Sequence, residues 1–465
     1  MFVLYYFTLL PGLGWGDVAK HQVEATQGGF PLTAGLHPWY HLLTNFFVSV
    51  FPFGQIAWRV NFLSSILALL ALYFFYKTLV RLKLSHQSCF FGTLLLALSH
   101  TFWSMALWAE SYALFAVLWI LAIGRVLLYL RYNNVKDLCW AFFFLGLGMG
   151  NNLIQPFAIP AIIITLVLLN SDIREFKFWY KPVLFGFLGL LPWLLRILYS
   201  WQIEGMDFAM LKHHAMDSKY EKYLFWNSPE NIASGFLKTT VFCIYQFGLC
   251  LIFICRKKIT ARETLFLSLL IFTLMLFCST YLAQRAAWLM MTAYIPLAFW
   301  ITMAYDGYNK NNENKTNTLR WLPLSQVLLY LITPILIQSI GNPLEIEQMG
   351  GRSIRSFLQP WKHTENSAEL YVQQIENTLN KGDVIVVDFT PAATLRYARD
   401  VENRLLDIQI CELKNLSTLL DNPPENQSIY LGRYNSAFKQ HMNHYSDWNV
   451  DTTTPYLFKL SKVQH

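Results

Sequence analysis

Charged residues are scarce in this chain. Only 14% of its 465 residues are Asp, Glu, Lys or Arg, while 54% are hydrophobic and 16% are aromatic. An average soluble domain has about 25% charged residues. This imbalance excludes an ordinary soluble protein and indicates an integral membrane protein.

Cysteine pairs and metal-binding spacings are also lacking. Six of the seven cysteines fall in or beside apolar runs, Cys411 stands alone in the polar C-terminal part, and no CxxC motif occurs. The adjacent His213 and His214 do not share a helix face, so they do not form a bidentate metal pair. The sequence predicts no disulfide framework and no metal site. A divalent cation is left open as a cofactor.

The net charge of +7 does not indicate a nucleic-acid partner, because the basic residues are confined to alternate loops. An excess of Lys and Arg marks the cytoplasmic loops of a multi-pass membrane protein. The basic residues of these loops are Lys77, Arg81, Lys83, Arg125, Arg131, Lys136, Arg174, Lys177, Lys181, Arg256, Lys257, Lys258, Arg262, Lys310, Lys315 and Arg320.

Apolar runs of about 17 to 20 residues recur along the first three-quarters of the chain, and each is long enough to cross a bilayer as a helix. Segments such as "SSILALLALYFFY" are apolar on every side, whereas barrel strands alternate polar and apolar residues. We therefore expect an all-α polytopic domain over residues 1–340. Its predicted spans lie near 60–76, 88–100, 112–130, 138–150, 153–169, 182–199, 237–255, 263–281, 287–305 and 321–339.

The N-terminal run "MFVLYYFTLL" adds one more predicted helix, for a total of about eleven. About fourteen apolar residues precede Asp17, roughly 21 Å of helix, which is short for a full crossing. The run lacks the basic residues and the small-residue cleavage site of a signal peptide. A membrane helix is therefore the preferred interpretation.

The loops opposite the basic ones carry the polar residues suited to chemistry. The first outer loop, residues 15–58, contains Asp17, Lys20, His21, Glu24, His37 and His41, and its aromatic part predicts one or two interfacial amphipathic helices. The polar residues at span ends also share this outer side: Asp17, Glu110, Asn151, Asn152 and Arg285. Chance would divide them between the two sides, so their common side predicts one site.

The composition becomes more polar after about Ile340. Residues 341–368 are interpreted as a linker and residues 369–465 as a small α/β domain. "AELYVQQIENTLN" and "PAATLRYARDV" predict helices, and "DVIVVDF", "DIQIC", "SIYLG" and "YLFKL" predict strands. An odd number of spans after a cytoplasmic N-terminus places this domain on the outer side, with Asp17.

Each candidate residue also has a structural interpretation. Asp17 would cap an interfacial helix, and Glu110 would stabilise the first turn of the next span. Arg59 and Arg285 would be snorkelling anchors at span ends. The glycines of "GLGMGNN" suit close helix packing, because no βαβ unit surrounds them as a dinucleotide loop requires.

Four ordered blocks favour the functional interpretation. "LYYFTLLPGLGWGD", "FPFGQIAWRVNFLSSILALLALYFFYKTLVRL", "TFWSMALWAESYAL" and "GLGMGNNLIQPFAIPA" closely resemble blocks of the DUF2723 family. That family belongs to the GT-C superfamily of polytopic glycosyltransferases and includes protein O-mannosyltransferases. The resemblance is strong over roughly residues 1–170 and weaker beyond. It implies a glycosyltransferase that moves a sugar from a polyprenyl-phosphate carrier to an acceptor, with inversion.

The resemblance also implies roles for single residues. Asp17 matches the catalytic aspartate of the family's "GDS.E" block, and Glu110 matches the glutamate of its "AE.Y" block. Lys20 departs from the family, which usually has glutamate there. The other matches are Arg59 and Asn61 in "WR.N" and Asn151 in "GN", whereas Asn152 stands where the family commonly has histidine.

The implied chemistry needs a carboxylate and cations. Asp17 would orient or deprotonate the acceptor, and basic side chains would stabilise the departing lipid phosphate. The predicted phosphate-binding residues are Arg285, Arg59 and Lys20. The predicted supporting polar residues are His37, Asn61, Asn151 and Asn152.

Two other functions stay open at this point. A lipid-sugar flippase or transporter would need inverted repeats or broken helices at the membrane midplane, and the sequence shows neither. An inactive scaffold is kept open by Lys20. The sequence specifies neither the sugar nor whether the acceptor is a protein, a lipid or a glycan. The absence of further targeting signals favours a bacterial inner membrane over the endoplasmic reticulum.

Overall fold

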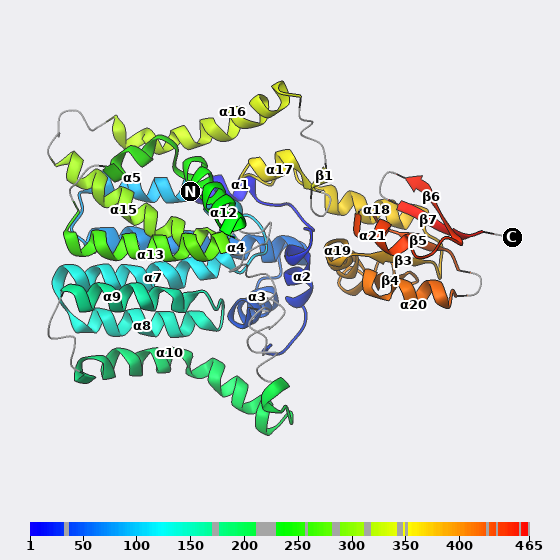
Figure 1. The fold of residues 1–465 in the computed structure, drawn as a ribbon, viewed down its shortest axis with the longest axis horizontal. Helices are drawn as coiled ribbons and strands as arrows, with labels where there is room; N and C mark the ends of the chain where they lie inside the picture. The colour runs from blue at the N-terminus through cyan, green and yellow to red at the C-terminus, as the bar shows by residue number, and fades with distance from the viewer. Residues whose placement is uncertain are drawn as a thin grey trace.

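The computed structural model describes residues 1–31, 37–169, 176–210, 229–255, 259–280, 289–310, 318–341, 347–348, 352–424, 427–433, 436–454 and 457–463. They form a block of long helices with a smaller domain of helices and strands beside it (Figure 1). The prediction of a mainly helical membrane protein with a small C-terminal α/β domain is confirmed.

Helices occupy the positions of the ten internal predicted spans. Within the described residues, six helical segments are long and apolar enough to cross a membrane, and His86–Leu98 and Gln155–Leu169 are shorter apolar helices. The total of about eleven crossings stays a prediction. The helices are α4 (Ile56–Arg81), α5 (His86–Leu98), α7 (Tyr112–Tyr132), α8 (Val135–Met149), α9 (Ala158–Leu169), α10 (Phe176–Gln202), α12 (Pro229–Phe247), α13 (Ala261–Thr280), α15 (Met291–Asn309) and α16 (Ser325–Ser339).

Short helical segments complete the block. The N-terminal run forms only α1 (Phe2–Thr8), whose 7 residues span about 10 Å. The first outer loop contains α2 (Asp17–Glu24) and α3 (Pro38–Val50), so the prediction of one or two helices there is confirmed. The remaining segments are α6 (His100–Met105), η2 (Gln155–Phe157), η5 (Gly248–Cys255) and η7 (Leu319–Leu324).

Close helix packing explains the glycine-rich end of α8. A Cβ atom on Gly146 would overlap the backbone of Gly186, and one on Gly189 would overlap the backbone of Phe143. Helices α8 and α10 therefore approach so closely that only glycine fits at their contact. This confirms the packing interpretation of "GLGMGNN" for Gly146.

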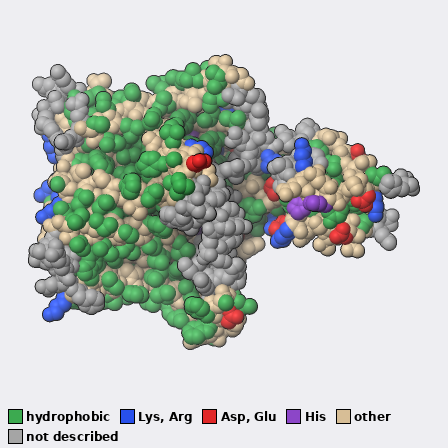
Figure 2. Space-filling model, in the orientation of Figure 1, with side chains coloured by type: hydrophobic (Ala, Val, Ile, Leu, Met, Phe, Trp, Pro, Cys, Tyr) green, Lys and Arg blue, Asp and Glu red, His purple; other side chains and the backbone are tan. Residues whose placement is uncertain are grey.

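The charged end of the helical block lies away from the C-terminal domain. Figure 2 shows Lys and Arg side chains at the edge of the block remote from that domain. Arg131 at the end of α7 pairs with the buried Glu263 of α13 at 2.7 Å, and Lys310 pairs with Asp306 at 2.7 Å. The basic loops and the C-terminal domain are thus at opposite ends of the molecule.

The C-terminal domain contains a five-stranded sheet in the order β4-β3-β5-β7-β6. Strands β4 and β5 are parallel to β3, and β7 is antiparallel to both β5 and β6. Two hydrophobic clusters, one on each face, pack the sheet against helices. The elements are α18 (Ser367–Thr378), β3 (Val384–Val387), α19 (Phe389–Asp400), β4 (Gln409–Glu412), α20 (Leu416–Asp421), β5 (Ile429–Leu431), α21 (Ser436–Met442), β6 (Trp448–Thr454) and β7 (Leu457–Lys462).

The predicted linker also contains regular structure. It includes the short strands β1 (Glu347–Gln348) and β2 (Arg352–Ser353) and the helix α17 (Ile354–Leu358). The Tyr245 hydroxyl of α12 donates to the Leu358 carbonyl at 2.7 Å. This segment therefore lies against the helical block before the chain enters the C-terminal domain.

Candidate active site

Helix α2 presents different faces to its neighbours. Val18 packs into the core of the helical block, while Ala19 and Val23 pack into a hydrophobic cluster that also contains residues of α18 and α19. Residues three, four and seven apart share a helix face. The polar face of α2 is therefore formed by Asp17, Lys20, His21 and Glu24.

Asp17 is the first helical residue of α2. The cap position before it is Gly16, which has a φ of +58° and no side chain to cap the helix. Glycine adopts this left-handed conformation without the strain that a Cβ atom causes. The carboxylate thus lies at the positive end of the helix dipole, which stabilises a negative charge. The structural interpretation of Asp17 as the capping residue does not apply.

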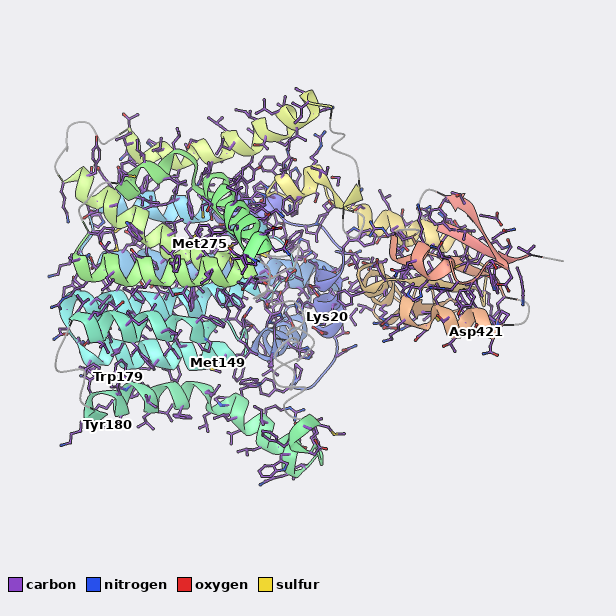
Figure 3. All side chains as sticks on the ribbon, viewed as in Figure 1. Lys20, Met149, Trp179, Tyr180, Met275 and Asp421 are labelled. Carbon is purple, nitrogen blue, oxygen red and sulfur yellow. The ribbon has the colours of Figure 1, made fainter. Side chains whose placement is uncertain are left out.

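Glu24, two turns after Asp17 along α2, contacts two residues of the same polar face. Lys20 Nζ lies 3.6 Å from Glu24 Oε1, and His21 Nδ1 donates to Glu24 Oε2 at 3.0 Å. Burial alone would raise the pKa of Glu24, but His21 and Lys20 outweigh it and the pKa is lowered overall. Glu24 is therefore ionised at neutral pH. Figure 3 shows Lys20 on α2, between the helical block and the C-terminal domain.

His37 joins α3 to the same cluster. Its ring centroid lies 5.6 Å from that of His21, and its Nδ1 donates to the Asn151 carbonyl at 2.5 Å. Burial, together with the positive charges of His21 and Lys20, lowers the pKa of His37 to about 4 despite the opposing charge of Asp17. The ring is neutral at pH 7, with its proton on Nδ1 and an acceptor at Nε2.

Glu110 lies two residues before α7, outside its first turn. The backbone of Glu110 hydrogen-bonds the Tyr40 hydroxyl, which also contacts Ser64 Oγ at 3.0 Å. Burial is the main cause of a raised Tyr40 pKa, and the negative charges of Glu110 and Glu24 add to it. Glu110 therefore lies beside Tyr40, whose ring centroid is 5.2 Å from that of His21 on α2.

Asn61 of α4 is hydrogen-bonded to three other segments of the chain. Its Nδ2 donates to the carbonyls of Leu10 at 3.1 Å and Gly12 at 2.9 Å. Its Oδ1 accepts from Gln22 Nε2 at 3.1 Å and from the Ala109 amide at 2.9 Å. The side chain is fully buried. Asn61 therefore fixes both the loop before Asp17 and the segment before Glu110 to α4.

Asn151 and Asn152 follow α8 and have different surroundings. Asn151 is fully buried, and its Nδ2 donates to the Ser111 carbonyl at 3.2 Å, which connects the end of α8 to the start of α7. Asn152 Oδ1 accepts from the Ile154 amide at 3.1 Å and stabilises a local turn. Asn151 thus belongs to the cluster around His37, whereas Asn152 has a local contact.

The two predicted arginines are placed differently. Arg59 donates from Nε to the Gly54 carbonyl at 2.8 Å, from Nη2 to Pro52 at 2.9 Å and from Nη1 to Val48 at 3.3 Å. These contacts hold the loop between α3 and α4. Arg285 lies outside the described residues.

A cavity of about 750 Å³ lies on the C-terminal-domain side of the loop that precedes α2. Arg59 and Arg404 contribute to its lining with the carboxylates Glu365, Glu369 and Glu402. Arg404 is already paired with Glu369 at 3.0 Å and with Glu402 at 2.9 Å. The cavity is thus polar, and Asp17 does not line it.

The described residues include no group of three or more His, Cys, Asp or Glu side chains that could hold a metal ion.

Sequence reasoning named His21 and Glu24 as polar residues of the outer loop but gave them no role, and it did not select Gln22 and Tyr40; the structure places all four in the cluster. His21 and Glu24 follow Asp17 by four and seven residues, so helical spacing alone would have placed them on its face. Gln22 and Tyr40 gave no such signal, because their partners Asn61 and Ser64 are distant in sequence.

The fold is of the GT-C type. Two solved structures of ArnT from Cupriavidus metallidurans match it with TM-scores of 0.59. The one bound to undecaprenyl phosphate is 11% identical, with 98% of this chain and 96% of that chain covered. The apo structure is 12% identical, with 98% and 95% covered. The chain is an integral, multi-pass membrane protein.

Sequence similarity points to one group of relatives. Residues 34–174 match the family model of the protein O-mannosyl-transferase TMEM260 N-terminal domain. Protein O-mannosyl-transferase tmem260 of Dictyostelium discoideum is 22% identical over 277 residues, which cover 53% of this chain. The chain spans about a third of that relative's length (33%). The matched range of the family model contains Glu110 and Asn151, while Asp17 and Lys20 precede it.

Proposed function

We propose that this protein is a membrane glycosyltransferase of the GT-C type, with Asp17 as the catalytic carboxylate. Its donor is a sugar linked to polyprenyl phosphate, and its acceptor is a hydroxyl or amide group on the outer side of the membrane. The observation that carries the proposal is the polar face of α2, which begins with Asp17. Helix α2 lies at the end of the helical block next to the C-terminal domain (Figure 1), and the basic side chains lie at the opposite end (Figure 2).

The reaction is a single displacement. The acceptor oxygen or nitrogen attacks the anomeric carbon while Asp17 takes its proton. The bond between that carbon and the phosphate oxygen breaks, and the lipid phosphate leaves with the electron pair. Attack from the face opposite the leaving group inverts the anomeric centre. General-base assistance of this kind contributes about 10² to 10⁴ in rate.

The departing phosphate requires positive charge. Lys20 is well placed, because it lies one helical turn after Asp17 and on the same face. Arg285 is proposed as a second phosphate ligand from its charge and its sequence position at the outer end of two predicted spans. Arg59 is bound to three carbonyl groups of its own loop, so we assign it mainly to loop structure.

Glu110, His37 and Asn151 complete the proposed site. His37 is neutral and fixed by Asn151, so it offers a hydrogen-bond acceptor without adding positive charge beside Lys20. Glu110 supplies a second carboxylate beside Tyr40, which contacts His21 of α2. The named relative makes mannose the first donor sugar to test, with a protein as first acceptor. We place the enzyme in a bacterial inner membrane, with its C-terminal domain in the periplasm.

The test uses purified full-length protein with a synthetic polyprenyl-phosphate mannose. We expect release of polyprenyl phosphate and, with an acceptor, a product of inverted anomeric configuration by NMR. Retention of configuration would contradict the single displacement. Movement of the intact lipid across proteoliposomes without release would favour a flippase, and neither activity would favour an inactive scaffold.

A further inference from the structure

The C-terminal domain is hydrogen-bonded to the loop that leads into Asp17. Thr394 Oγ1 of α19 donates to the Gly14 carbonyl at 3.1 Å, and the Gly16 amide donates to the Thr390 carbonyl at 3.2 Å. Trp15 Nε1 donates to Ser367 Oγ of α18 at 2.8 Å. Helix α19 therefore holds Gly14 and Gly16, and α18 holds Trp15 between them. The C-terminal domain thus fixes the three successive positions before Asp17.

The C-terminal domain is also hydrogen-bonded to the first turn of α4. The amide of Ala57 donates to the Tyr397 hydroxyl of α19 at 2.9 Å. Amides in the first turn of a helix have no partner within that helix, so Tyr397 satisfies a group that would otherwise be unpaired. Both Thr394 and Tyr397 are buried, with 0% and 1% exposure. Helix α19 thus links the Asp17 loop and α4 through two buried hydroxyl groups.

A second attachment limits movement of the domain. The Lys362 amide in the segment before α18 donates to the Thr8 carbonyl at the end of α1, at 2.8 Å. Its ammonium group is buried, donates to the Ser356 and Gln359 carbonyls, and lies 5.0 Å from the centre of the Trp108 ring. The domain is therefore fixed to the helical block at α1 as well as at α2.

We propose that the C-terminal domain is a positioning element of the active site: Thr394 holds the loop that leads into Asp17, and Tyr397 holds the first turn of α4, to which Gln22 of α2 is hydrogen-bonded. This inference rests on the proposed function. The Thr394 hydroxyl contacts the loop before Asp17 and the Tyr397 hydroxyl contacts the first turn of α4, so both are positioning residues that act through the backbone. Loss of their hydroxyl groups lowers kcat by misplacing the base.

The test compares Thr394→Val and Tyr397→Phe with the wild type in the full-length protein. We expect kcat to fall about three- to tenfold for each, the rate equivalent of one net hydrogen bond. Thr394→Ser keeps the hydroxyl group and should restore kcat. Thr378→Val is the matched control, because Thr378 Oγ1 donates to the Gln374 carbonyl within α18.

Hydrogen exchange gives a readout independent of turnover. The amides of α2 should exchange faster in Thr394→Val than in the wild type, and should not change in Thr378→Val. Unchanged kcat and unchanged exchange in α2 would overturn the positioning role while Asp17→Asn remained inactive. A rise in donor KM with constant kcat would also overturn it. Wild-type activity of Asp17→Asn would instead refute the proposed function.

Discussion

Replacing Asn61 with leucine tests whether the outer loop is fixed as described. The substitution keeps the approximate size of the side chain and removes four hydrogen bonds. The Gly12 carbonyl keeps Gln22 Nε2 as a donor at 3.1 Å. The Leu10 carbonyl and the Ala109 amide lose the Asn61 side chain and are left in a buried environment.

The magnitude follows from these two backbone groups. An unsatisfied buried group costs about 1 to 3 kcal/mol, so Asn61→Leu should destabilise the protein by about 2 to 6 kcal/mol. Asn45→Leu is the matched control. Asn45 is only partly buried and donates to the Glu24 and His41 carbonyls. We expect a loss below about 1.5 kcal/mol there, the net value of an ordinary hydrogen bond.

The assay is reversible unfolding in mixed micelles by added dodecyl sulfate, followed by tryptophan fluorescence. The free energies of unfolding of the wild type, Asn61→Leu and Asn45→Leu are compared under one condition. Equal destabilisation by the two substitutions, or a loss below about 1 kcal/mol for Asn61→Leu, would refute the assignment of Asn61 as the residue that fixes the loop.

Three further predictions concern charge and topology. The pKa of His37 is lowered to about 4, so the folded state should lose stability as the pH falls from about 6.5 to about 4, and should not lose it above that range. The unfolding temperature of His37→Gln should therefore fall less over this pH range than that of the wild type. Lys20→Ala should raise the donor KM, and Arg285→Lys should reduce donor use because lysine lacks the planar fork of donors; wild-type kinetics in both would remove them from the phosphate site. Lys381 is largely exposed, so the Lys381→Cys variant should react with an impermeant thiol reagent added outside intact cells. Labelling only after lysis would contradict the topology.

Local patterns were enough to predict most of the fold. The spans follow from continuous apolar runs. Strand β3 is predictable because its sequence, "VIVV", is a short continuous apolar run, and all four residues are buried in the structure. Strand β6 was missed because its sequence "WNVDTTT" is largely polar and lies at the edge of the sheet. Such a strand depends on pairing with β7, which no local pattern indicates.

The candidate site was predictable only in part. Asp17 and Glu110 were selected because they lie at span ends on one side and match a family pattern. The contacts that hold them were not predictable, because they join distant segments: Gln22 to Asn61, and Thr394 to Gly14. The buried Lys362 was also missed, because its segment was interpreted as a polar linker.

The central claim is that Asp17 is the base of a sugar transfer, and one comparison tests it most directly. Single-turnover transfer from polyprenyl-phosphate mannose is measured for the wild type, Asp17→Asn and Asp207→Asn, each checked for unaltered unfolding. Asp207 is the matched control, since it is exposed and accepts a hydrogen bond from the Met210 amide at 2.7 Å. The proposed mechanism predicts a loss of about 10² to 10⁴ in rate for Asp17→Asn and wild-type rates for Asp207→Asn. Transfer by Asp17→Asn at the wild-type rate would contradict it.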